Sequence, residues 1–185
     1  MDGVVMCGGR GTRLEAETEK PLLEINGRPM VERVLAALQA SQIERVHAAV
    51  SPNAPETRTY VEGTPASLIE TPGEGYVEDL KYVLERVGQP VLTVAADLPL
   101  LSADVVTRVR DAHGGGSLAV CTPVTIKELL DLSVGHTVQK DGRELAPTGV
   151  NVVGEGEETT HVTYDIRLAV NVNRRSDVDI AEVLA

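Results

Sequence analysis

Four short apolar runs, each followed by a loop rich in glycine or proline, constrain the fold of this chain most. They lie at Asp2–Met6, Arg45–Val50, Ser67–Glu70 and Val91–Ala96. Residues 31–38 and 77–87 carry apolar side chains at helical spacing. Strands of nearly continuous valine and alanine that alternate with amphipathic helices are typical of a mostly parallel sheet covered on both faces. The sequence therefore predicts an α/β fold.

The second half of the chain continues this pattern less clearly. Further strands are expected at Ser117–Val120 and Val150–Gly154, and we expect Asn171 and Asn173 to lie on a late strand. Residues 123–147 hold a candidate short helix, IKELLDL, and a turn, KDGRE, so they form an excursion from the sheet. A final helix follows, with Ser176 as its expected N-cap and Asp179 in the capping-box position.

The loops that follow the four apolar runs hold the most unusual segments of the chain. In order they contain GGRG, SPN, TPGEG and ADLP. Ligands of parallel sheets bind at the carboxyl ends of the strands. The sequence therefore predicts one cleft that these four loops share.

Length and composition indicate the number of domains and the cellular compartment. With 185 residues, 42% of them apolar, the chain is expected to form a single domain, residues 1–185. No apolar stretch approaches the ~20 residues of a membrane span. No signal peptide is apparent, and the two cysteines form no disulfide or zinc pattern. We expect a cytoplasmic protein without a membrane-spanning segment.

Charge is strongly biased. The chain has 28 acidic and 17 basic residues, a net charge of −11, and no Phe or Trp. An acidic surface poor in lysine suits a high-salt, halophilic cytoplasm, where self-repulsion is screened; an ordinary acidic protein is the alternative. The same charge argues against a nucleic-acid partner, which needs a basic face.

The loop after the first run concentrates main-chain amides and positive charge. Its glycines and basic residues are Gly8, Gly9, Arg10, Gly11, Arg13 and Lys20. Glycine amides approach anions closely and form anion-binding nests. A P-loop and a dinucleotide fingerprint are both excluded, since GxxxxGK[ST] and the third glycine of GxGxxG are missing. A tight turn with solvated basic residues is the alternative, but EKPL at short range favours a phosphate site.

These residues carry a resemblance. GGRGTRL followed by EKPL resembles the N-terminal motif of nucleotidyltransferases that join an NTP to a phosphorylated acceptor, with Cys7 in place of the usual alanine. SPNAPETRTYVEG, TPGEGYVEDL, PTGVNVVG and the NVN ending resemble archaeal GTP:adenosylcobinamide-phosphate guanylyltransferases. The likeness spans nearly the whole chain and is weakest at residues 101–146.

The resemblance implies both a fold and a reaction. The fold is a Rossmann-like three-layer sandwich of the nucleotide-diphospho-sugar transferase type. In the reaction, the acceptor phosphate of adenosylcobinamide phosphate attacks the α-phosphorus of GTP. Pyrophosphate leaves and adenosylcobinamide-GDP forms, a step of cobamide (coenzyme B12) biosynthesis.

The resemblance also implies roles for the first loop. The Gly8, Gly9 and Gly11 amides and Arg13 would hold the β- and γ-phosphates, and Lys20 would lie near the α-phosphate and the acceptor. Arg10 and Thr12 complete the expected nucleotide-binding set. Arg13, Lys20 and Asp97 are the expected catalytic residues.

Asp97 is the candidate metal ligand. It follows the most apolar run, VLTVAA, so its carboxylate is expected at the carboxyl edge of the sheet, where Mg²⁺ bridges carboxylate and phosphate oxygens. A helix cap is the alternative role, but Ser102 is a better cap for the following helix. In the superfamily an aspartate at this position binds the metal, so the expected cofactor is Mg²⁺.

Guanine and acceptor contacts are expected from the other loops. Guanine needs an acceptor for N1–H and N2–H₂ and a donor for O6. The candidates, for which plain turn chemistry is the alternative, are Ser51, Asn53, Thr71, Gly73, Glu74 and Gly75. Asn151 and Asn171 are the candidates for the acceptor side, since a buried asparagine must be hydrogen-bonded.

Several alternatives stay open. One is a guanylyltransferase acting on molybdopterin or phospholactate, and another is a sugar-1-phosphate nucleotidyltransferase. A third is a non-catalytic GTP-binding regulator, which would not need both Lys20 and Asp97. A homodimer also stays open, because an apolar helix face serves a core and an interface alike.

Overall fold

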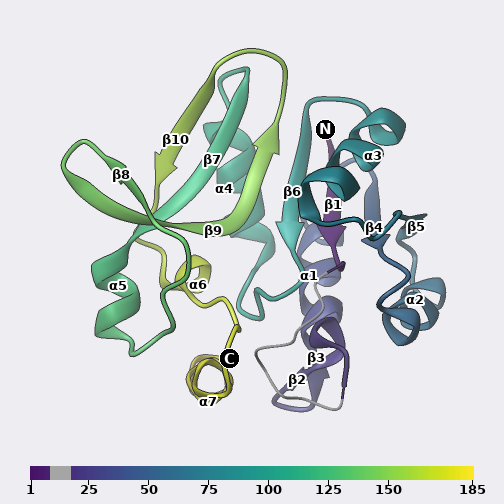
Figure 1. Cartoon of the computed structure of the whole chain (residues 1–185), viewed down its shortest axis with the longest axis horizontal. Helices are drawn as coiled ribbons and strands as arrows, with labels where there is room; N and C mark the ends of the chain where they lie inside the picture. Colours follow the sequence, from purple (N-terminus) through teal and green to yellow (C-terminus); the bar gives the residue numbers. More distant parts are fainter. Residues whose placement is uncertain (9–17) are drawn as a thin grey trace.

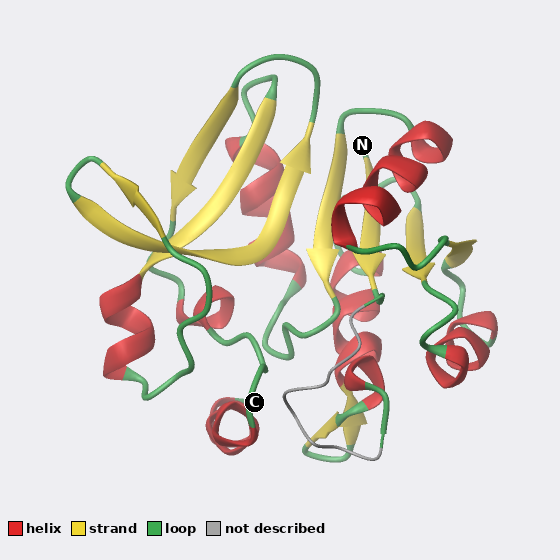
Figure 2. Ribbon diagram, in the orientation of Figure 1, coloured by secondary structure: helices red, strands yellow, loops and turns green. Residues whose placement is uncertain are grey.

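An eight-stranded mixed sheet organises the molecule (Figures 1 and 2). The computed structural model describes residues 1–8 and 18–185. The strand order is β10-β7-β9-β6-β1-β4-β5, with β8 paired to β9. The strands are β1 (Asp2–Met6), β4 (Val46–Val50), β5 (Ser67–Glu70), β6 (Val91–Ala95), β7 (Ser117–Pro123), β8 (Val138–Lys140), β9 (Arg143–Val153) and β10 (Glu158–Val162). A separate two-stranded ribbon joins β2 (Glu24–Ile25) and β3 (Arg28–Pro29).

The strand directions confirm a mostly parallel sheet. β5, β4, β1 and β6 are parallel to one another, as the four apolar runs predict. β9 is antiparallel to both β6 and β7, and β10 is parallel to β7. The single reversed strand, β9, makes the sheet mixed.

Helices cover both faces of the sheet, which confirms the three-layer sandwich. The helices are η1 (Lys20–Leu22), α1 (Met30–Gln39), α2 (Pro55–Glu62), α3 (Tyr76–Val87), α4 (Ala103–Ala112), α5 (Val124–Leu129), α6 (Ile166–Ala169) and α7 (Arg175–Leu184). The largest core cluster joins α1, α2 and α4 to one face, and α3 packs on the other face through Val83 and its neighbours. In Figure 1, α3 lies in front of the sheet and no helix lies in front of β7, β9 and β10.

Two expectations for the second half were wrong. Asn171 and Asn173 do not lie on a strand: they follow α6 in an irregular segment, in which the Val172 N–H donates to the Asp97 carbonyl (3.0 Å). Ser176 is not the N-cap of α7, which is Arg174, because the Asp177 carboxylate accepts the Arg174 N–H at 2.8 Å.

The segment at residues 123–147 leaves the sheet only in part, because β8 and the start of β9 pair within the main sheet. Its short helix is α5, and its turn joins β8 to β9 through Asp141 (φ 49°) and Gly142 (φ 71°). Two successive residues with positive φ form the type I′ turn that suits a two-residue hairpin. β9 begins seven residues before the expected Val150, because β8 and the end of β7 both supply partners for this extension.

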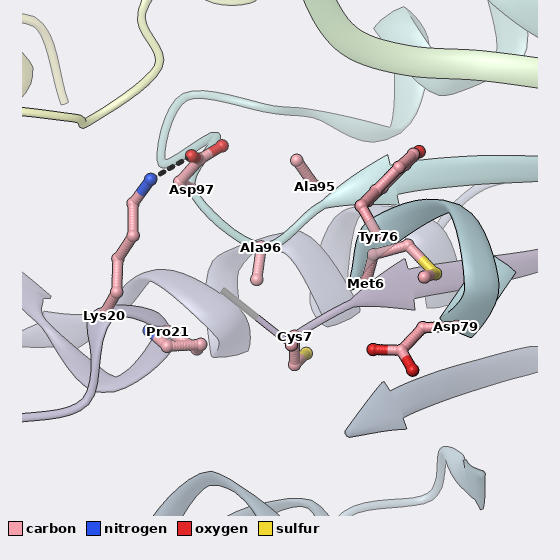
Figure 3. A pocket seen from close by; sticks show the side chains of 10 residues that line it. Met6, Cys7, Lys20, Pro21, Tyr76, Asp79, Ala95, Ala96 and Asp97 are labelled. Carbon is pink, nitrogen blue, oxygen red and sulfur yellow. Dashed lines mark hydrogen bonds and ion pairs between the residues drawn. The ribbon is translucent and has the colours of Figure 1, made fainter. Parts of the chain in front are cut away.

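The carboxyl ends of the parallel strands meet at one edge. Figure 3 views that edge from close by, with Cys7 just past β1, and Ala96 and Asp97 just past β6. In the described ranges 1–8 and 18–185, no helix has the length and apolar character needed to cross a membrane.

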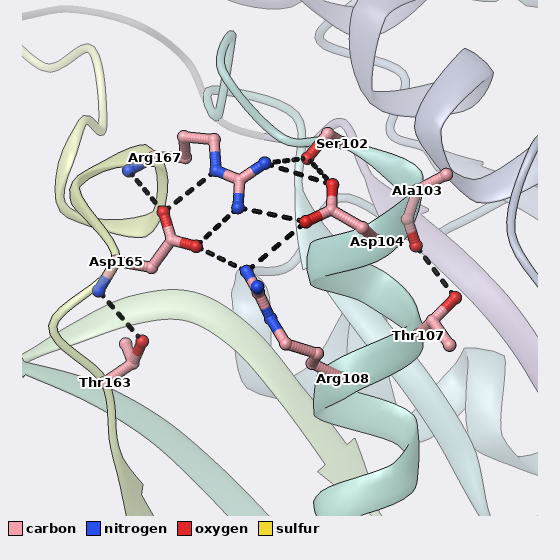
Figure 4. A network of polar contacts seen from close by, with 8 residues as sticks. All are labelled: Ser102, Ala103, Asp104, Thr107, Arg108, Thr163, Asp165 and Arg167. Carbon is pink, nitrogen blue, oxygen red and sulfur yellow. Dashed lines mark hydrogen bonds and ion pairs between the residues drawn. The ribbon is translucent and has the colours of Figure 1, made fainter.

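A polar network fastens α6 to α4 (Figure 4). The Arg167 guanidinium donates to Asp165 (2.9 and 2.7 Å), to Asp104 (two bonds of 3.0 Å) and to Ser102 (2.8 Å). Arg108 pairs with the same two carboxylates. Hydrogen bonds from Ser102 and then Arg167 lower the pKa of Asp104 to about 2. Ser102 thus bonds to Asp104 and Arg167 rather than capping α4 with its side chain.

Arg167→Met should lower the melting temperature at low salt, because Asp104 and Asp165 would lose one of the two guanidinium groups that they share. The loss should shrink in 1 M salt, where the Debye length falls to ~3 Å. Thermal unfolding followed by circular dichroism at both salt concentrations measures this. Arg58→Met, which removes a surface arginine paired with Glu62 and Glu70, is the control. Identical melting of the Arg167 variant and the wild type at low salt would contradict a stabilising network.

Candidate active site

The segment EKPL is anchored on both sides of Lys20. The Glu19 carboxylate accepts the N–H of Glu56 (2.9 Å) and the N–H and hydroxyl of Thr57 (2.7 and 2.6 Å), so it satisfies free donors at the start of α2. Pro21 is buried and occupies the first turn of η1, where its missing N–H costs nothing. Lys20 is thereby held at the carboxyl edge of the sheet.

Lys20 and Asp97, 77 positions apart in the sequence, form an ion pair and hydrogen bond through Nζ and Oδ2. Both side chains are 16% exposed. Lys20 Nζ also donates to Asn173 Oδ1 at 3.1 Å. Asp97 Oδ1 is buried and has no hydrogen-bond partner among residues 1–8 and 18–185. The two expected catalytic residues are therefore in direct contact, with one carboxylate oxygen uncommitted in the part of the chain described.

A fully buried carboxylate, Asp177, fixes Asn173 beside Lys20. It accepts the N–H of Asn173 and of Arg174 (both 2.8 Å) and the N–H and hydroxyl of Ser133 (2.8 and 2.6 Å). Burial alone would raise the pKa of Asp177, but these hydrogen bonds from Ser133, Asn173 and Arg174 lower it below its ordinary value. Asp177 is therefore a positioning residue for the site.

Asn171 belongs to an adjoining polar cluster with Thr148 and Lys127. Its Nδ2 donates to the Thr148 carbonyl (2.7 Å), and its Oδ1 accepts from Lys127 Nζ (3.2 Å). Lys127 is buried and also donates to the Ala169 carbonyl at 2.7 Å. Burial lowers the pKa of Lys127. Both ends of the Asn171 amide are engaged within the protein, and its acceptor contact stays a prediction.

A cavity of about 200 Å³ extends from the Lys20–Asp97 pair (Figure 3). It is lined by Met6, Cys7, Gly8, Lys20, Pro21, Tyr76, Asp79, Ala95, Ala96 and Asp97. Burial raises the pKa of the Cys7 thiol to about 12, so this side chain stays protonated at neutral pH and serves packing. The lining is mainly apolar, with charge at its two ends.

The loops after β1, β4 and β5 converge beside this cavity. The Ser51 hydroxyl donates a hydrogen bond to the Gly8 carbonyl oxygen, at 3.5 Å. Gly73 has φ 76°, and a Cβ there would lie 2.9 Å from Pro52 and 3.3 Å from Asn53, so only glycine fits. Gly8 and Asp97, from the loops after β1 and β6, line the cavity. SPN and TPGEG contact its lining residues through Ser51 and Gly73 but contribute none themselves, so a cleft shared by all four loops stays a prediction.

The other loop candidates differ in burial and in their position relative to the cavity. Thr71 is buried, and its hydroxyl has no partner among the described residues. Gly75 is the N-cap of α3. Asn53 and Glu74 are exposed and do not line the cavity. Their contacts with guanine stay predictions.

Asn151 lies apart from the cavity. It is on β9, opposite Thr93 of β6, and lines a second hollow of about 380 Å³ with Cys121 and Glu158. This hollow is lined by residues of β7, β8, β9 and β10. In Figure 1, α4 lies behind this part of the sheet and no helix lies in front of it. Five expected nucleotide-binding residues lie outside the described residues: Gly9, Arg10, Gly11, Thr12 and Arg13.

Sequence reasoning missed three residues that shape the site. Glu19 and Asp177 act through main-chain donors, and Asp79 lines the cavity from the first turn of α3. The signal for Asp79 was available, because an acid in the first turn after TPGEG is placed at the same sheet edge. Nothing in the sequence pairs Asp177 with Ser133, 44 positions away.

Comparison with known proteins decides the family. The model described as a MobA-like NTP transferase domain matches residues 3–138. The chain belongs to this family. The assignment makes it an NTP transferase, which confirms the enzyme class expected from the glycine-rich loop and EKPL.

Individual relatives agree with this assignment. The adenosylcobinamide-phosphate guanylyltransferase of Methanocaldococcus jannaschii is 29% identical, over 100% of this chain and 97% of the relative. The bifunctional protein GlmU of Kineococcus radiotolerans is 29% identical over 89% of this chain, which spans only 33% of GlmU. A solved nucleotidyl transferase from Methanothermobacter has the same fold, with a TM-score of 0.67 at 17% identity over 95% of this chain and 93% of that one. The resemblance drawn from the motifs is confirmed.

Asp177→Asn should lower the free energy of unfolding by about 1–3 kcal/mol at pH 7, because an amide NH₂ would face several main-chain donors. The folded-state pKa of Asp177 is depressed. Its stabilisation is therefore present above the unfolded-state pKa of about 3.9 and is lost as pH falls through the lower folded value. Urea unfolding at pH 7 and at pH 3 should show the wild-type advantage shrinking.

Asp179→Asn, an exposed change on the same helix, is the control for this measurement. It should leave the unfolding midpoint nearly unchanged at both pH values. Equal stability of wild type and Asp177→Asn at pH 7 would show that the buried carboxylate does not hold the site together.

Proposed function

We propose that the chain transfers GMP from GTP to adenosylcobinamide phosphate, giving adenosylcobinamide-GDP and pyrophosphate. The observation that carries this proposal is the contact of Lys20 with Asp97 and Asn173 at one end of the cavity. The full-length alignment with a guanylyltransferase of that name supports the choice of acceptor over others. The motifs SPN and PTGVNVV support it as well.

The proposed reaction depends more on positive charges placed near the phosphates than on a general base. An acceptor phosphate is already anionic, so the protein need not remove a proton from it. It must hold two polyanions together and neutralise the charge that develops on pyrophosphate. Lys20 is a fixed cation for the α-phosphate and the acceptor phosphate, because Glu19 anchors its segment to α2 and Asn173 orients its Nζ.

The residues present fit a magnesium ion. Asp97 Oδ1 is a buried carboxylate oxygen with no hydrogen-bond partner in the ranges 1–8 and 18–185. Asn173 Oδ1 is a second oxygen nearby, because Lys20 Nζ donates to it as well as to Asp97. Hard oxygen ligands of this kind suit Mg²⁺, which keeps several waters and binds substrate phosphates. The described residues hold no cluster of three or more His, Cys, Asp or Glu side chains, so nucleotide and water would supply the remaining ligands. Bound Mg²⁺ would neutralise phosphate charge during transfer.

The acceptor is proposed to approach over the face of β7, β9 and β10 that lies in front in Figure 1. The hollow beside Asn151 lies on β7, β9 and β10, and Asn151 stands opposite Thr93 on β6, the strand that leads to Asp97. A large acceptor would meet no helix on that face in Figure 1. The acid excess further supports work at high salt within an archaeal cytoplasm.

A second candidate is guanylyl transfer to another phosphorylated acceptor, molybdopterin or phospholactate, with which the family description, an NTP transferase domain, is equally compatible. Pyrophosphate release from GTP and Mg²⁺ in molar salt, with adenosylcobinamide phosphate, molybdopterin and phospholactate assayed side by side, decides between acceptors. We expect turnover with adenosylcobinamide phosphate. Turnover with another acceptor alone would transfer the proposal to that acceptor, and GTP binding without any turnover would favour a regulator.

Asp97→Ala should reduce kcat by about 10²–10³-fold, the usual loss when one electrostatic group of a transfer site is removed. Asp111→Ala, which removes an exposed carboxylate on α4, should keep wild-type activity. Circular dichroism spectra of both variants check that they remain folded. Full activity of a folded Asp97→Ala protein would remove Asp97 from the mechanism.

A further inference from the structure

A second buried carboxylate lines the cavity at the end away from the Lys20–Asp97 pair. Asp79 is 3% exposed and belongs to the first turn of α3. Figure 3 shows its carboxylate on the far side of Cys7 and Ala96 from Lys20 and Asp97. The proposed mechanism gives this acidic group no role.

The two oxygens of Asp79 differ in their surroundings. Oδ1 accepts the Gly73 N–H at 2.8 Å, which ties the carboxylate to the TPGEG loop. Oδ2 lies 3.2 Å from the position that a Cβ on Gly8 would occupy. Among residues 1–8 and 18–185, Asp79 forms no ion pair and Oδ2 has no hydrogen-bond partner. A glycine at position 8 keeps side-chain atoms away from this oxygen.

A buried carboxylate is costly unless a partner compensates it. The start of α3 stabilises the negative charge of Asp79 in part. The Gly73 bond uses one of the four acceptor positions of the carboxylate, and neutral asparagine could make that bond equally well. The negative charge of Asp79 therefore indicates that a hydrogen-bond donor from outside the described residues binds its carboxylate.

Guanine offers the matching donors. Its N1–H and N2–H₂ lie side by side on one edge, and a carboxylate accepts from both. Adenine presents an unprotonated N1 at the same position, and xanthine keeps N1–H but presents an oxygen in place of the 2-amino group, so each base directs an acceptor lone pair at a carboxylate oxygen. Asn53 and Glu74, the other candidate readers, are exposed and do not line the cavity.

We propose that Asp79 is the residue that selects guanine, by accepting hydrogen bonds from N1–H and N2–H₂ of the GTP base. The inference rests on the proposed function for the presence of GTP in the cavity. The phosphates then lie toward Lys20 and Asp97, and the base lies between Gly8 and the start of α3. At the Asp79 end of the cavity the loops after β1, β4 and β5 lie together, since Ser51 bonds to Gly8 and Gly73 bonds to Asp79.

Nucleotide binding to the wild-type chain gives the first test, and no acceptor is needed. Isothermal titration with Mg²⁺ and each of GTP, ITP, XTP and ATP measures Kd. ITP lacks only the 2-amino group and should bind about 10-fold more weakly than GTP, while XTP and ATP should bind about 100-fold more weakly. Equal affinity for GTP and XTP would overturn the proposal without any variant.

Asp79→Asn gives the second test, because it places an amide NH₂ where guanine needs an acceptor and xanthine needs a donor. The ratio of XTP to GTP affinity should rise by about 100-fold over wild type. Glu78→Gln is the matched control: it removes one acid from the same helix turn, on an exposed side chain paired with Lys81, and should leave the ratio unchanged. A folded Asp79→Asn protein that weakens all four nucleotides equally would assign Asp79 a purely structural role.

The two proposals fail in distinguishable ways. If the wild type releases pyrophosphate with adenosylcobinamide phosphate but Asp79→Asn leaves the ratio of XTP to GTP affinity unchanged, Asp79 does not select guanine and the proposed reaction stands. If the ratio switches but no acceptor is turned over, Asp79 reads guanine and the proposed reaction is wrong.

Discussion

The ion pair between Lys20 and Asp97 is the interaction on which the rest of the site depends. It joins the loops after β1 and β6 across 77 positions of sequence, at the edge where the parallel strands end. Charges that are mostly buried lose hydration, and they are stable only when geometry and further hydrogen bonds compensate. Asn173 supplies one such bond, and Glu19 limits the freedom of the lysine segment. The result is a fixed cation beside a carboxylate whose second oxygen has no hydrogen-bond partner among residues 1–8 and 18–185.

The support of this pair comes from the part of the fold that departs from a simple parallel sheet. Residues 170–174 do not form a strand; Val172 bonds to the Asp97 carbonyl, and Asp177 gathers the N–H groups of Asn173 and Arg174. A strand would have alternated these side chains between the two faces of the sheet. The irregular segment instead brings Asn173 to Lys20. The departure from regular structure is what completes the site.

Much of the fold could be predicted, because its signals are local. The runs that became β1, β4, β5 and β6 are apolar and bounded by glycine and proline, and their parallel order follows from the helices between them. The meeting of Lys20 with Asp97 was predictable for the same reason. The N-cap of α7, the irregular segment before it and the role of Asp177 were not, since they depend on contacts between α7, Ser133 and the loop after β6. Propensity places a serine cap at Ser176, and tertiary hydrogen bonds override it.

The central claim is that Lys20 and Asp97 grip the phosphates of a guanine nucleotide in this cavity. A crystal structure with Mg²⁺ and a non-hydrolysable GTP analogue tests it most directly. The account requires the α-phosphate within hydrogen-bond distance of Lys20 Nζ and Asp97 on the phosphate side of the cavity. A nucleotide whose phosphates lie elsewhere, with the Lys20–Asp97 pair unchanged and distant from it, would contradict the account.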